Sequence, residues 1–253
     1  MAKKYLGQNF LYDPSILRKI IEIAELDKDD LVIEIGPGPG RLTRMLAERV
    51  KKVIAIELDY RLFEELKEQL SEFKNIELVY GDALKHPYEN LSRFKVVANI
   101  PYYITTPIIF KLLEVRKNIE TITLTVQKEV AERIVAKPGG KDYGLLSITV
   151  QYCAKPFLKF VIPKEAFRPI PKVDSAVLYM RILEKPAAEV RDEKFFFRII
   201  RAAFSQRRKK LSNSLKVIRA DIKEKLNEAG IDLNRRPETL SIEEFARLAN
   251  ILL

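Results

Sequence analysis

The sequence predicts an α/β fold in which a seven-stranded sheet with flanking helices is followed by a small all-helical domain. Three observations support this prediction. Apolar, strand-like runs alternate with helix-like stretches through residues 1–184, a glycine-rich turn follows the first run, and residues 185–253 contain helical patterns only. A chain of 253 residues with 47% hydrophobic content is long enough for one large and one small domain. We therefore expect one domain over residues 1–184 and a second over residues 185–253.

The strands are expected where apolar or alternating runs stand between turn-forming residues. Five runs indicate strands of one sheet, the first of them a buried parallel strand, and two alternating runs joined by a proline-rich loop indicate an antiparallel pair that closes the sheet. In chain order the seven runs occupy residues 31–35, 53–56, 76–80, 94–98, 121–126, 157–162 and 173–182. After a linker at residues 184–189, helices are expected over residues 192–204, 206–215, 221–228 and 242–252.

Composition excludes several kinds of chemistry. Cys153 is the only cysteine and His86 the only histidine, which excludes intramolecular disulfides, zinc sites built from Cys and His, and most histidine-based nucleophilic triads. No run approaches the ~18 uninterrupted apolar residues of a membrane span, and the amino terminus lacks the apolar core of a signal peptide. We expect a cytoplasmic protein that needs no metal and binds no membrane.

The charge predicts a polyanionic partner. The chain has 45 Lys and Arg against 35 Asp and Glu, a formal charge of +10, and residues 185–253 hold 16 basic and 10 acidic side chains. Four consecutive cations begin the expected helix over residues 206–215, where they suit RNA phosphates: Arg207, Arg208, Lys209 and Lys210. The alternative interpretation is a solvated helix face.

Polar or glycine residues follow four consecutive predicted strands. These are Gly36, Glu57, Asp82 and Asn99, and the carboxyl ends of parallel strands form the ligand-binding edge of open α/β sheets. Glycines in the loop 36–40 let the backbone approach a ligand, and Glu57, 21 residues after Gly36, suits the two hydroxyls of a ribose. Asp82 can accept a hydrogen bond from an adenine amino group. The pattern predicts an adenosine-type ligand and is shared by nicotinamide-dependent dehydrogenases and adenosylmethionine-dependent methyltransferases, although GxGxG in place of GxGxxG disfavours a dinucleotide.

The segment Asn99-Ile100-Pro101-Tyr102 suits a planar base. The side-chain oxygen of Asn99 and the backbone carbonyl of Pro101 can both accept from an exocyclic amino group, which draws out the delocalised lone pair of an adenine N6. Tyr102 offers a ring on which the base can stack. Phe167, in the loop 163–172 among cations and prolines, is a candidate for the second face of the base. The alternatives are a capping Asn with a packed Tyr, and a Phe that anchors its loop in the core.

Nine segments in order along the chain resemble those of the ribosomal RNA small-subunit adenine N6-dimethyltransferase family, which is linked to kasugamycin resistance. The segments are LGQNFL, EIGPGPG, IELD, GDA, NIPYYITT, QKEVAERIVA, YGLLSI, FRPIPKVDSAV and AFSQRRKKLSNSL. The resemblance implies a Rossmann-like seven-stranded methyltransferase sheet that binds S-adenosyl-L-methionine. It implies cofactor contacts from Asn9, Leu11, Gly36, Glu57, Asp82 and Asn99. It implies a pocket for the target adenine built by Asn99, Pro101, Tyr102 and Phe167.

The resemblance also implies the reaction. Family members methylate N6 of two adjacent adenosines in the 3′-terminal hairpin loop of small-subunit (16S) rRNA, each twice, so the expected partner is this rRNA or an assembling small ribosomal subunit, bound by a monomer. Two departures are Tyr103, where asparagine is common, and Thr125-Val126, where Met-Leu is more usual. Three alternatives stay open: the sister family that dimethylates one adenine of large-subunit rRNA, a binding factor on the same fold, and a nicotinamide oxidoreductase. The last lacks a plausible histidine for hydride transfer.

Overall fold

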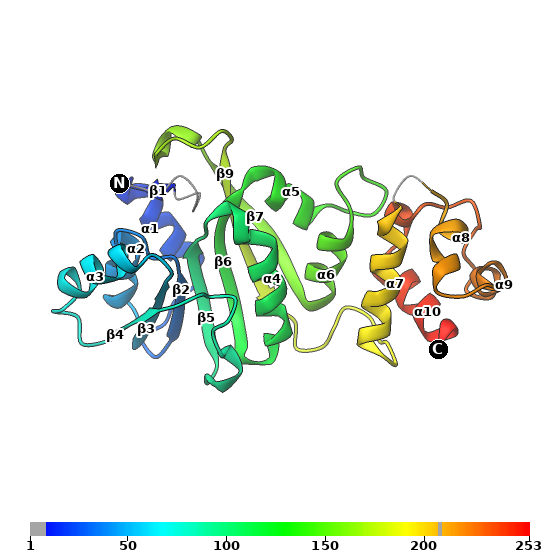
Figure 1. The fold of residues 1–253 in the computed structure, drawn as a ribbon, viewed down its shortest axis with the longest axis horizontal. Coiled ribbons are helices and arrows are strands. Elements are labelled where there is room, and N and C mark those ends of the chain that lie inside the picture. The colour runs from blue at the N-terminus through cyan, green and yellow to red at the C-terminus, as the bar shows by residue number, and fades with distance from the viewer. Residues whose placement is uncertain (1–8, 207–208) are drawn as a thin grey trace. The chain divides into compact units, whose positions relative to one another are not determined.

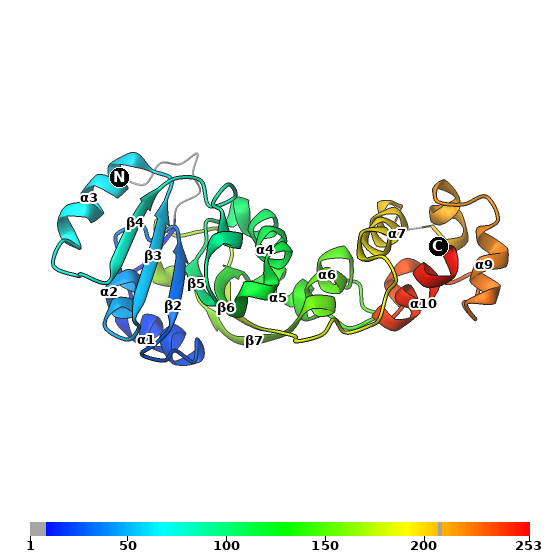
Figure 2. The same ribbon diagram turned by 90° about the horizontal axis from the view of Figure 1, so that it is seen from below.

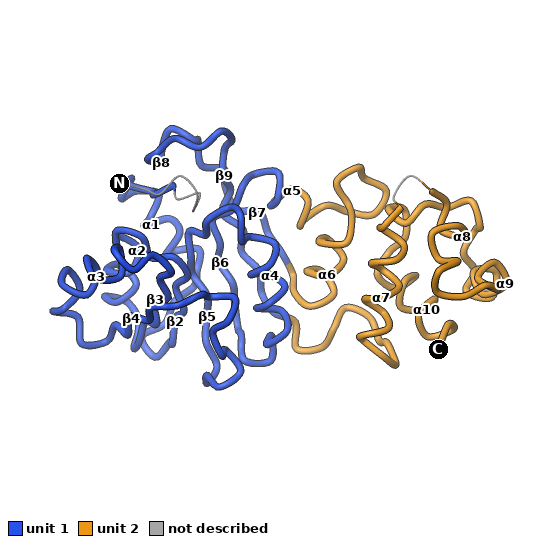
Figure 3. Tube along the Cα trace, viewed as in Figure 1, with its two compact units in different colours: residues 1–131, 156–182 blue, residues 132–155, 183–253 orange. Residues whose placement is uncertain are grey.

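The computed structural model describes residues 9–206 and 209–253 and divides into two compact units (Figure 3). The first unit contains the chain up to Ala131 together with Pro156–Ile182, and the second contains Glu132–Lys155 together with Leu183–Leu253. The segment 132–155, which the sequence analysis assigns to the first domain, therefore packs within the second unit. A functional boundary between residues 184 and 185 stays a prediction.

The first unit is built on the predicted seven-stranded sheet, whose strand order is β4-β3-β2-β5-β6-β9-β7 (Figure 1). β4, β3, β2, β5 and β6 are parallel neighbours, and β9 runs antiparallel to β6. The strands are β2 (Leu31–Ile35), β3 (Lys52–Glu57), β4 (Ile76–Tyr80), β5 (Phe94–Asn99), β6 (Ile119–Gln127), β7 (Ala154–Ile162) and β9 (Ser175–Ile182). Two very short strands, β1 (Phe10–Leu11) and β8 (Phe167–Arg168), pair with each other in a separate antiparallel ribbon.

Helices cover both faces of the sheet, and this explains why most residues of its central strands are apolar. Figure 2 shows α1 (Pro14–Ile23) and α2 (Arg41–Ala47) on one face and α4 (Thr105–Glu114) on the other. A core cluster joins α1 and α2 to strand residues such as Val32, Val53 and Val97, all less than 1% exposed. α3 (Tyr60–Gln69) packs beside β4, and α5 (Lys128–Val135) follows β6. A strand buried on both faces has no polar side, so its sequence shows no alternation.

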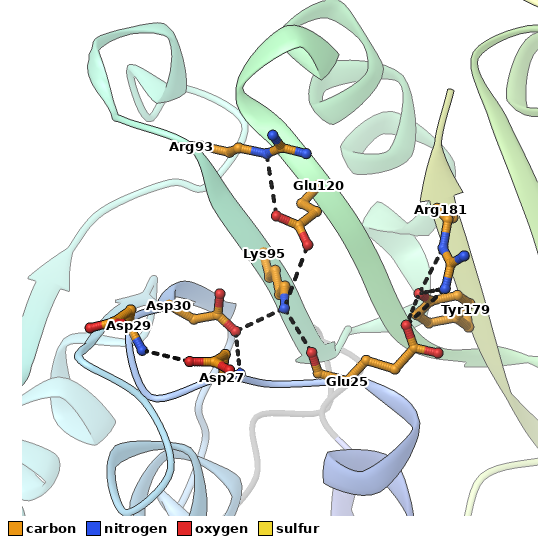
Figure 4. Close-up of polar contacts among 9 residues, drawn as sticks. All are labelled: Glu25, Asp27, Asp29, Asp30, Arg93, Lys95, Glu120, Tyr179 and Arg181. Atoms are coloured by element: carbon orange, nitrogen blue, oxygen red, sulfur yellow. Dashed lines mark hydrogen bonds and ion pairs between the residues drawn. The ribbon is translucent and has the colours of Figure 1, made fainter. Parts of the chain in front are cut away.

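An ion-pair network at the amino ends of the parallel strands joins the end of α1 to the sheet (Figure 4). The ammonium of Lys95, on buried β5, lies 2.9 Å from the carboxylate of Asp30 and donates to the carbonyl of Glu25 at 2.7 Å. The carboxylate of Glu25 accepts from the hydroxyl of Tyr179 at 2.8 Å and pairs with Arg181 at 2.9 Å. These contacts hold Glu25, just after α1, at a left-handed φ of +51°, which is costly for a residue with a Cβ.

The second unit is helical over its described residues 183–206 and 209–253. Its helices there are α7 (Glu193–Ser205), α8 (Leu211–Ser214), α9 (Ile222–Glu228) and α10 (Ile242–Leu252), and α6 (Leu145–Cys153) packs against α7. Aromatic side chains build its core: the rings of Tyr152 and Phe196 lie 4.8 Å apart. None of the helices in the described ranges is both long and apolar enough to cross a membrane.

The expected helix over residues 206–215 is wrong in its extent, because α8 begins only at Leu211. Lys210 has an extended backbone, with φ −60° and ψ 147°, and the N–H of Leu211 donates to the carbonyl of Arg235 at 2.8 Å. The hydroxyl of Ser212 donates to the carbonyl of Leu233 at 3.0 Å. Hydrogen bonds to a distant segment thus take the place of the first helical turn.

Candidate active site

Four neighbouring parallel strands end at one edge of the sheet. The registers of β4, β3, β2 and β5 place their carboxyl ends side by side. The hydrogen-bond ladder continues past the strands, since the N–H of Gly36 donates to the carbonyl of Ile56 and the N–H of Gly81 donates to the carbonyl of Glu57, both at 2.9 Å. The residues that the sequence analysis places at strand ends therefore gather at this edge: Gly36, Glu57, Asp82 and Asn99.

Two adjoining hollows open there. The first is bordered by the arm that carries β1, the glycine-rich loop after β2 and the segment after β5, and the second by the ends of β3 and β4 and the turn after β5. They share Gly36, Glu57 and Pro101 as lining residues. All six residues expected to hold a cofactor line these hollows, the first by Asn9, Leu11, Gly36, Glu57 and Asn99 and the second by Asp82.

The arm lies directly on the glycine-rich loop. Gly38 has a φ of +57°, and a Cβ at this position would stand 2.7 Å from the ring of Phe10. Only glycine meets both conditions, the left-handed backbone and the close approach of the ring. Both Gly38 and Phe10 line the first hollow, so the loop and the arm border it together.

Glu57 is held by backbone donors on both of its oxygens. Oε2 accepts from the N–H of Gly38 at 3.2 Å and Oε1 from the N–H of Asp59 at 2.8 Å, while the side chain is buried at the end of β3. Burial raises the pKa of this carboxyl, and the two backbone donors oppose the rise. Because each carboxylate oxygen has two lone pairs, both oxygens keep accepting capacity toward the hollow.

Asn99 is oriented by the arm. Its side-chain nitrogen donates to the backbone carbonyl of Asn9 at 3.1 Å, across 90 residues of sequence. Only the NH₂ end of the amide can donate to a carbonyl, so this partner assigns the amide orientation and directs Oδ1 away from Asn9. An acceptor is therefore fixed at the edge of the first hollow, where Asn99 is a lining residue.

Pro101 and Tyr102 complete the rim after β5. The carbonyl of Pro101 accepts from the N–H of Ile104 at 3.1 Å, which uses one of its two lone pairs. The hydroxyl of Tyr102 lies 2.6 Å from the hydroxyl of Ser175, and burial raises the pKa of this phenol. Both residues line the first hollow, so the structure brings them to Asn99 as expected.

Glu34 is a site residue that the sequence analysis does not single out. It lines the first hollow, is 1% exposed, and its Oε2 has no hydrogen-bond partner among the described residues. Burial, followed by the charge of Glu57, raises its pKa to about 8. The available signal was a carboxylate inside the otherwise apolar run Leu-Val-Ile-Glu-Ile, since a buried strand rarely carries a charge without a partner.

Phe167 is not brought to either hollow. Its ring is fully buried in the core cluster with Leu17, Ile162 and Val177, and its backbone pairs with Leu11 across the β1–β8 ribbon. Neither hollow has Phe167 in its lining. In this structure Phe167 packs in the same core cluster as Leu11 of the arm, which agrees with the alternative of a Phe that anchors its loop in the core.

The cationic cluster is described only in part, since Arg207 and Arg208 lie outside the described residues. Lys209 and Lys210 are exposed and precede α8, and the ammonium of Lys210 donates to the side-chain oxygen of Asn234 at 2.6 Å.

The sheet order and the hollows at its carboxyl edge define the class as a Rossmann-like methyltransferase, and comparisons with known proteins agree. The family model described as ribosomal RNA adenine dimethylase matches residues 1–253. The Ribosomal RNA small subunit methyltransferase A of Clostridium acetobutylicum is 49% identical over 254 residues, covering 98% of this chain and 92% of that protein. The protein of the same name from Moorella thermoacetica is 48% identical, covering 100% and 93%.

Two solved structures extend the comparison. A dimethyladenosine transferase from Plasmodium falciparum superposes with a TM-score of 0.79 at 29% identity, covering 94% of this chain and 95% of that chain. The 23S rRNA methyltransferase ErmE superposes with a TM-score of 0.74 at 32% identity, covering 96% and 99%. The chain belongs to the ribosomal RNA adenine dimethylase family.

Proposed function

We propose that this enzyme transfers methyl groups from S-adenosyl-L-methionine to N6 of two adjacent adenosines in the 3′-terminal hairpin loop of small-subunit (16S) rRNA. The product is N6,N6-dimethyladenosine, made in the cytoplasm during ribosome biogenesis. The observation that carries the proposal is the fixed orientation of Asn99, whose donor end is occupied by Asn9 so that its oxygen is kept for an amino group. The names of the relatives from Clostridium acetobutylicum and Moorella thermoacetica support small-subunit rRNA as the substrate.

The residues that line the two hollows support binding of the cofactor there. The glycine-rich loop, the buried carboxylate of Glu57 and the unpartnered oxygen of Glu34 are the features expected where a nucleoside and an amino-acid moiety bind. Adenosylmethionine supplies an activated methyl group, so neither a metal nor a nucleophilic side chain is required. Glu57 would hold the ribose hydroxyls and Asp82 the adenine amino group, with Asn9 and Leu11 closing the first hollow from the arm.

The chain's own contribution to transfer is at the adenine amino group. Oδ1 of Asn99 and the second lone pair of the Pro101 carbonyl accept hydrogen bonds from the N6 hydrogens, two before the first transfer and one before the second, and favour the positive charge that develops on nitrogen. The ring of Tyr102 stacks on the base, which must leave the RNA loop to reach the hollow. The N6–CH3 bond forms as the S–CH3 bond breaks, S-adenosylhomocysteine is the leaving group, and the N6 proton is lost to solvent.

In this proposal the ring of Phe167 stacks on the face of the target base opposite Tyr102. Because its ring is buried in the core cluster, the clamp requires the ring to leave that cluster when RNA binds. A residue that only fills the core and a residue that also holds the base should give different ratios of singly to doubly methylated adenosine when the ring is removed.

RNA binding is proposed for residues 185–253, with methyl transfer assigned to residues 1–184. The exposed cations Lys209 and Lys210, together with Arg207 and Arg208, would contact phosphates. The partner is small-subunit rRNA or an assembling small subunit, bound by a single copy of the chain. Rates of methylation measured on naked rRNA and on an assembling particle would distinguish the two substrates.

Large-subunit rRNA is the second candidate substrate, because ErmE, a 23S rRNA methyltransferase, is 32% identical over nearly the whole chain. Nucleoside mass spectrometry of 16S and 23S rRNA from a deletion strain, with and without the restored gene, separates the two. Dimethyladenosine that returns only in 16S rRNA is the expected result. Its return in 23S rRNA alone would replace the proposed substrate.

The catalytic assignment is tested with Asn99→Ala. Loss of one oriented acceptor should cost ~3 kcal/mol of transition-state stabilisation, roughly a hundredfold in rate, with most cofactor affinity retained. Asn118→Ala is the matched control. Asn118 directly precedes the amino end of β6, and its side-chain amide donates to the carbonyls of Glu89 and Leu91. Near-normal turnover of Asn99→Ala would remove Asn99 from the reaction.

A further inference from the structure

The hydroxyl of Tyr102 is tied to a residue that lies outside the hollows. It is 2.6 Å from the hydroxyl of Ser175, the first residue of β9. Ser175 is fully buried, whereas Tyr102 is partly exposed at the rim of the first hollow. A separation of 2.6 Å is at the short end of the range for hydroxyl pairs, and burial of one partner shields the bond from competing water.

The position of Ser175 is fixed by the elements around it. It pairs with Gln127 at the end of a continuous antiparallel register between β6 and β9. The preceding residue, Asp174, accepts at its carbonyl from the N–H of Lys128 at 3.0 Å and at its carboxylate from the N–H of Lys164 at 3.1 Å. The serine hydroxyl is therefore a stationary anchor between the start of α5 and the β7–β9 loop.

Tyr102, by contrast, stands on a short 3-10 turn, Tyr102–Ile104. A tyrosine on such a turn moves its ring mainly by rotation about χ1, which swings the hydroxyl through an arc. Rotation about χ2 leaves the hydroxyl where it is, because the oxygen lies on that axis. A hydrogen bond at the hydroxyl therefore holds the direction of the ring and prevents the ring from swinging into solvent.

We propose that Ser175 is a positioning residue for methyl transfer: through the hydroxyl of Tyr102 it holds the ring beside Asn99, ready to stack on the target base. The inference rests on the proposed function, in which the base lies on Tyr102. Ser175 itself touches neither the base nor the cofactor. Ser175 acts before methyl transfer, because it reduces the number of orientations that the Tyr102 ring can adopt when the base binds.

The test is a double-mutant cycle of wild type, Ser175→Ala, Tyr102→Phe and the double variant, with small-subunit rRNA as substrate. Either single change removes the bond while the aromatic ring is kept, so each should lower kcat/KM for RNA about 5- to 20-fold, with the Kd for adenosylmethionine within about twofold of wild type. The double variant should be no slower than the slower single variant. Ser175→Thr, which keeps a hydroxyl, should restore most of the rate.

Ser147→Ala is the matched control, because Ser147 is equally buried and donates to the carbonyl of Arg133 at 2.6 Å within the second unit. It should lower the midpoint of thermal unfolding without changing kcat/KM. Multiplicative losses in the double variant, or an unchanged rate in Ser175→Ala, would overturn the positioning role while leaving the proposed function intact. A wild-type protein that transfers no methyl to either rRNA would instead overturn the proposed function, and the inference with it.

Discussion

Glu34 is a buried carboxyl whose pKa lies far above the ordinary value for a glutamate. Burial raises its pKa to about 8 from the 4.5 of an unperturbed carboxyl, and the nearby Glu57 adds to the rise. The folded protein therefore binds more protons at this group than the unfolded chain does between these two pH values. Since stability falls with pH wherever the folded state holds the extra proton, Glu34 should destabilise the fold progressively from about pH 4.5 to about pH 8 and by a constant amount above that.

Glu34→Gln should remove this dependence, because glutamine is neutral at every pH. The difference in unfolding free energy between variant and wild type should grow by about 1.4 kcal/mol per pH unit across the window. Urea denaturation from pH 5 to pH 9, without cofactor, measures it. Glu68→Gln, an exposed change on α3, should run parallel to wild type. If the unfolding free energy of Glu34→Gln also changed with pH in parallel with wild type, Glu34 would ionise in the folded protein as it does in the unfolded chain.

Glu57 is assigned to the ribose, and its two backbone donors make the prediction specific. Glu57→Ala should weaken adenosylmethionine binding by ~1 to 3 kcal/mol, the scale of a charge-assisted hydrogen bond, with RNA affinity nearly unchanged. Calorimetric titration with cofactor and a filter-binding titration with RNA report the two affinities separately. Equal losses of both would indicate that the glycine-rich loop has collapsed without its carboxylate.

At the scale of elements, the long strands could be predicted from sequence and the shortest ones could not. The runs 31–35 and 76–80 match β2 and β4 to the residue, because both are strand-forming stretches bounded by turn-forming residues. β2 is buried, whereas β4, at the edge of the sheet, has no buried residue. β1 and β8 have two residues each, too few to show any periodicity, and are defined only by pairing across more than 150 positions. The same limit explains α8, whose start is set by hydrogen bonds to residues 233–235.

Phe167 shows how this affects the site. From sequence, an aromatic among prolines and cations fits a base-stacking loop equally well as a core anchor, and only the pairing of β8 with β1 reveals the buried ring. Asn99 is different, because its place at the end of a predicted strand determined the edge at which it lies. Its orientation, however, depends on the carbonyl of Asn9, 90 residues away.

Two substitutions at Phe167 separate its possible roles. Phe167→Ala should cost ~3 to 5 kcal/mol of stability by leaving a cavity in the core cluster, whereas Phe167→Leu keeps most of the volume and loses only the flat ring. If the ring clamps the base, both variants should release more singly methylated product. We expect nucleoside mass spectrometry to show a higher ratio of N6-methyl to N6,N6-dimethyl adenosine in each, at unchanged cofactor affinity. A wild-type ratio in Phe167→Leu would confine the residue to the core.

At the scale of the whole molecule, the sequence predicts two domains but not which unit the segment 132–155 joins. α6 is buried at Leu146, Ile148 and Val150, on more than one side, so its pattern carries no face that would select a neighbour. The excess positive charge, by comparison, is visible directly in the sequence. Its assignment to RNA binding is the remaining prediction.

Replacing Arg207, Arg208, Lys209 and Lys210 with Gln lowers the formal charge from +10 by four, to +6. If these side chains bind phosphates, RNA affinity should fall and the slope of log affinity against log salt should flatten by roughly 0.7 to 0.9 for each phosphate that is no longer neutralised. Adenosylmethionine affinity should not change, because the cofactor residues lie in the first unit. Binding titrations over a series of salt concentrations give the slope.

The control for net charge replaces four exposed cations of the first unit with Gln: Lys51, Lys67, Lys74 and Lys117. It lowers the formal charge equally but leaves every proposed phosphate-binding side chain in place. Long-range attraction depends on total charge and is screened within about 10 Å at 0.1 M salt, so the control should slow association without flattening the slope to the same degree. Identical slopes for the two variants would show that the cluster acts only through its charge and is a solvated face.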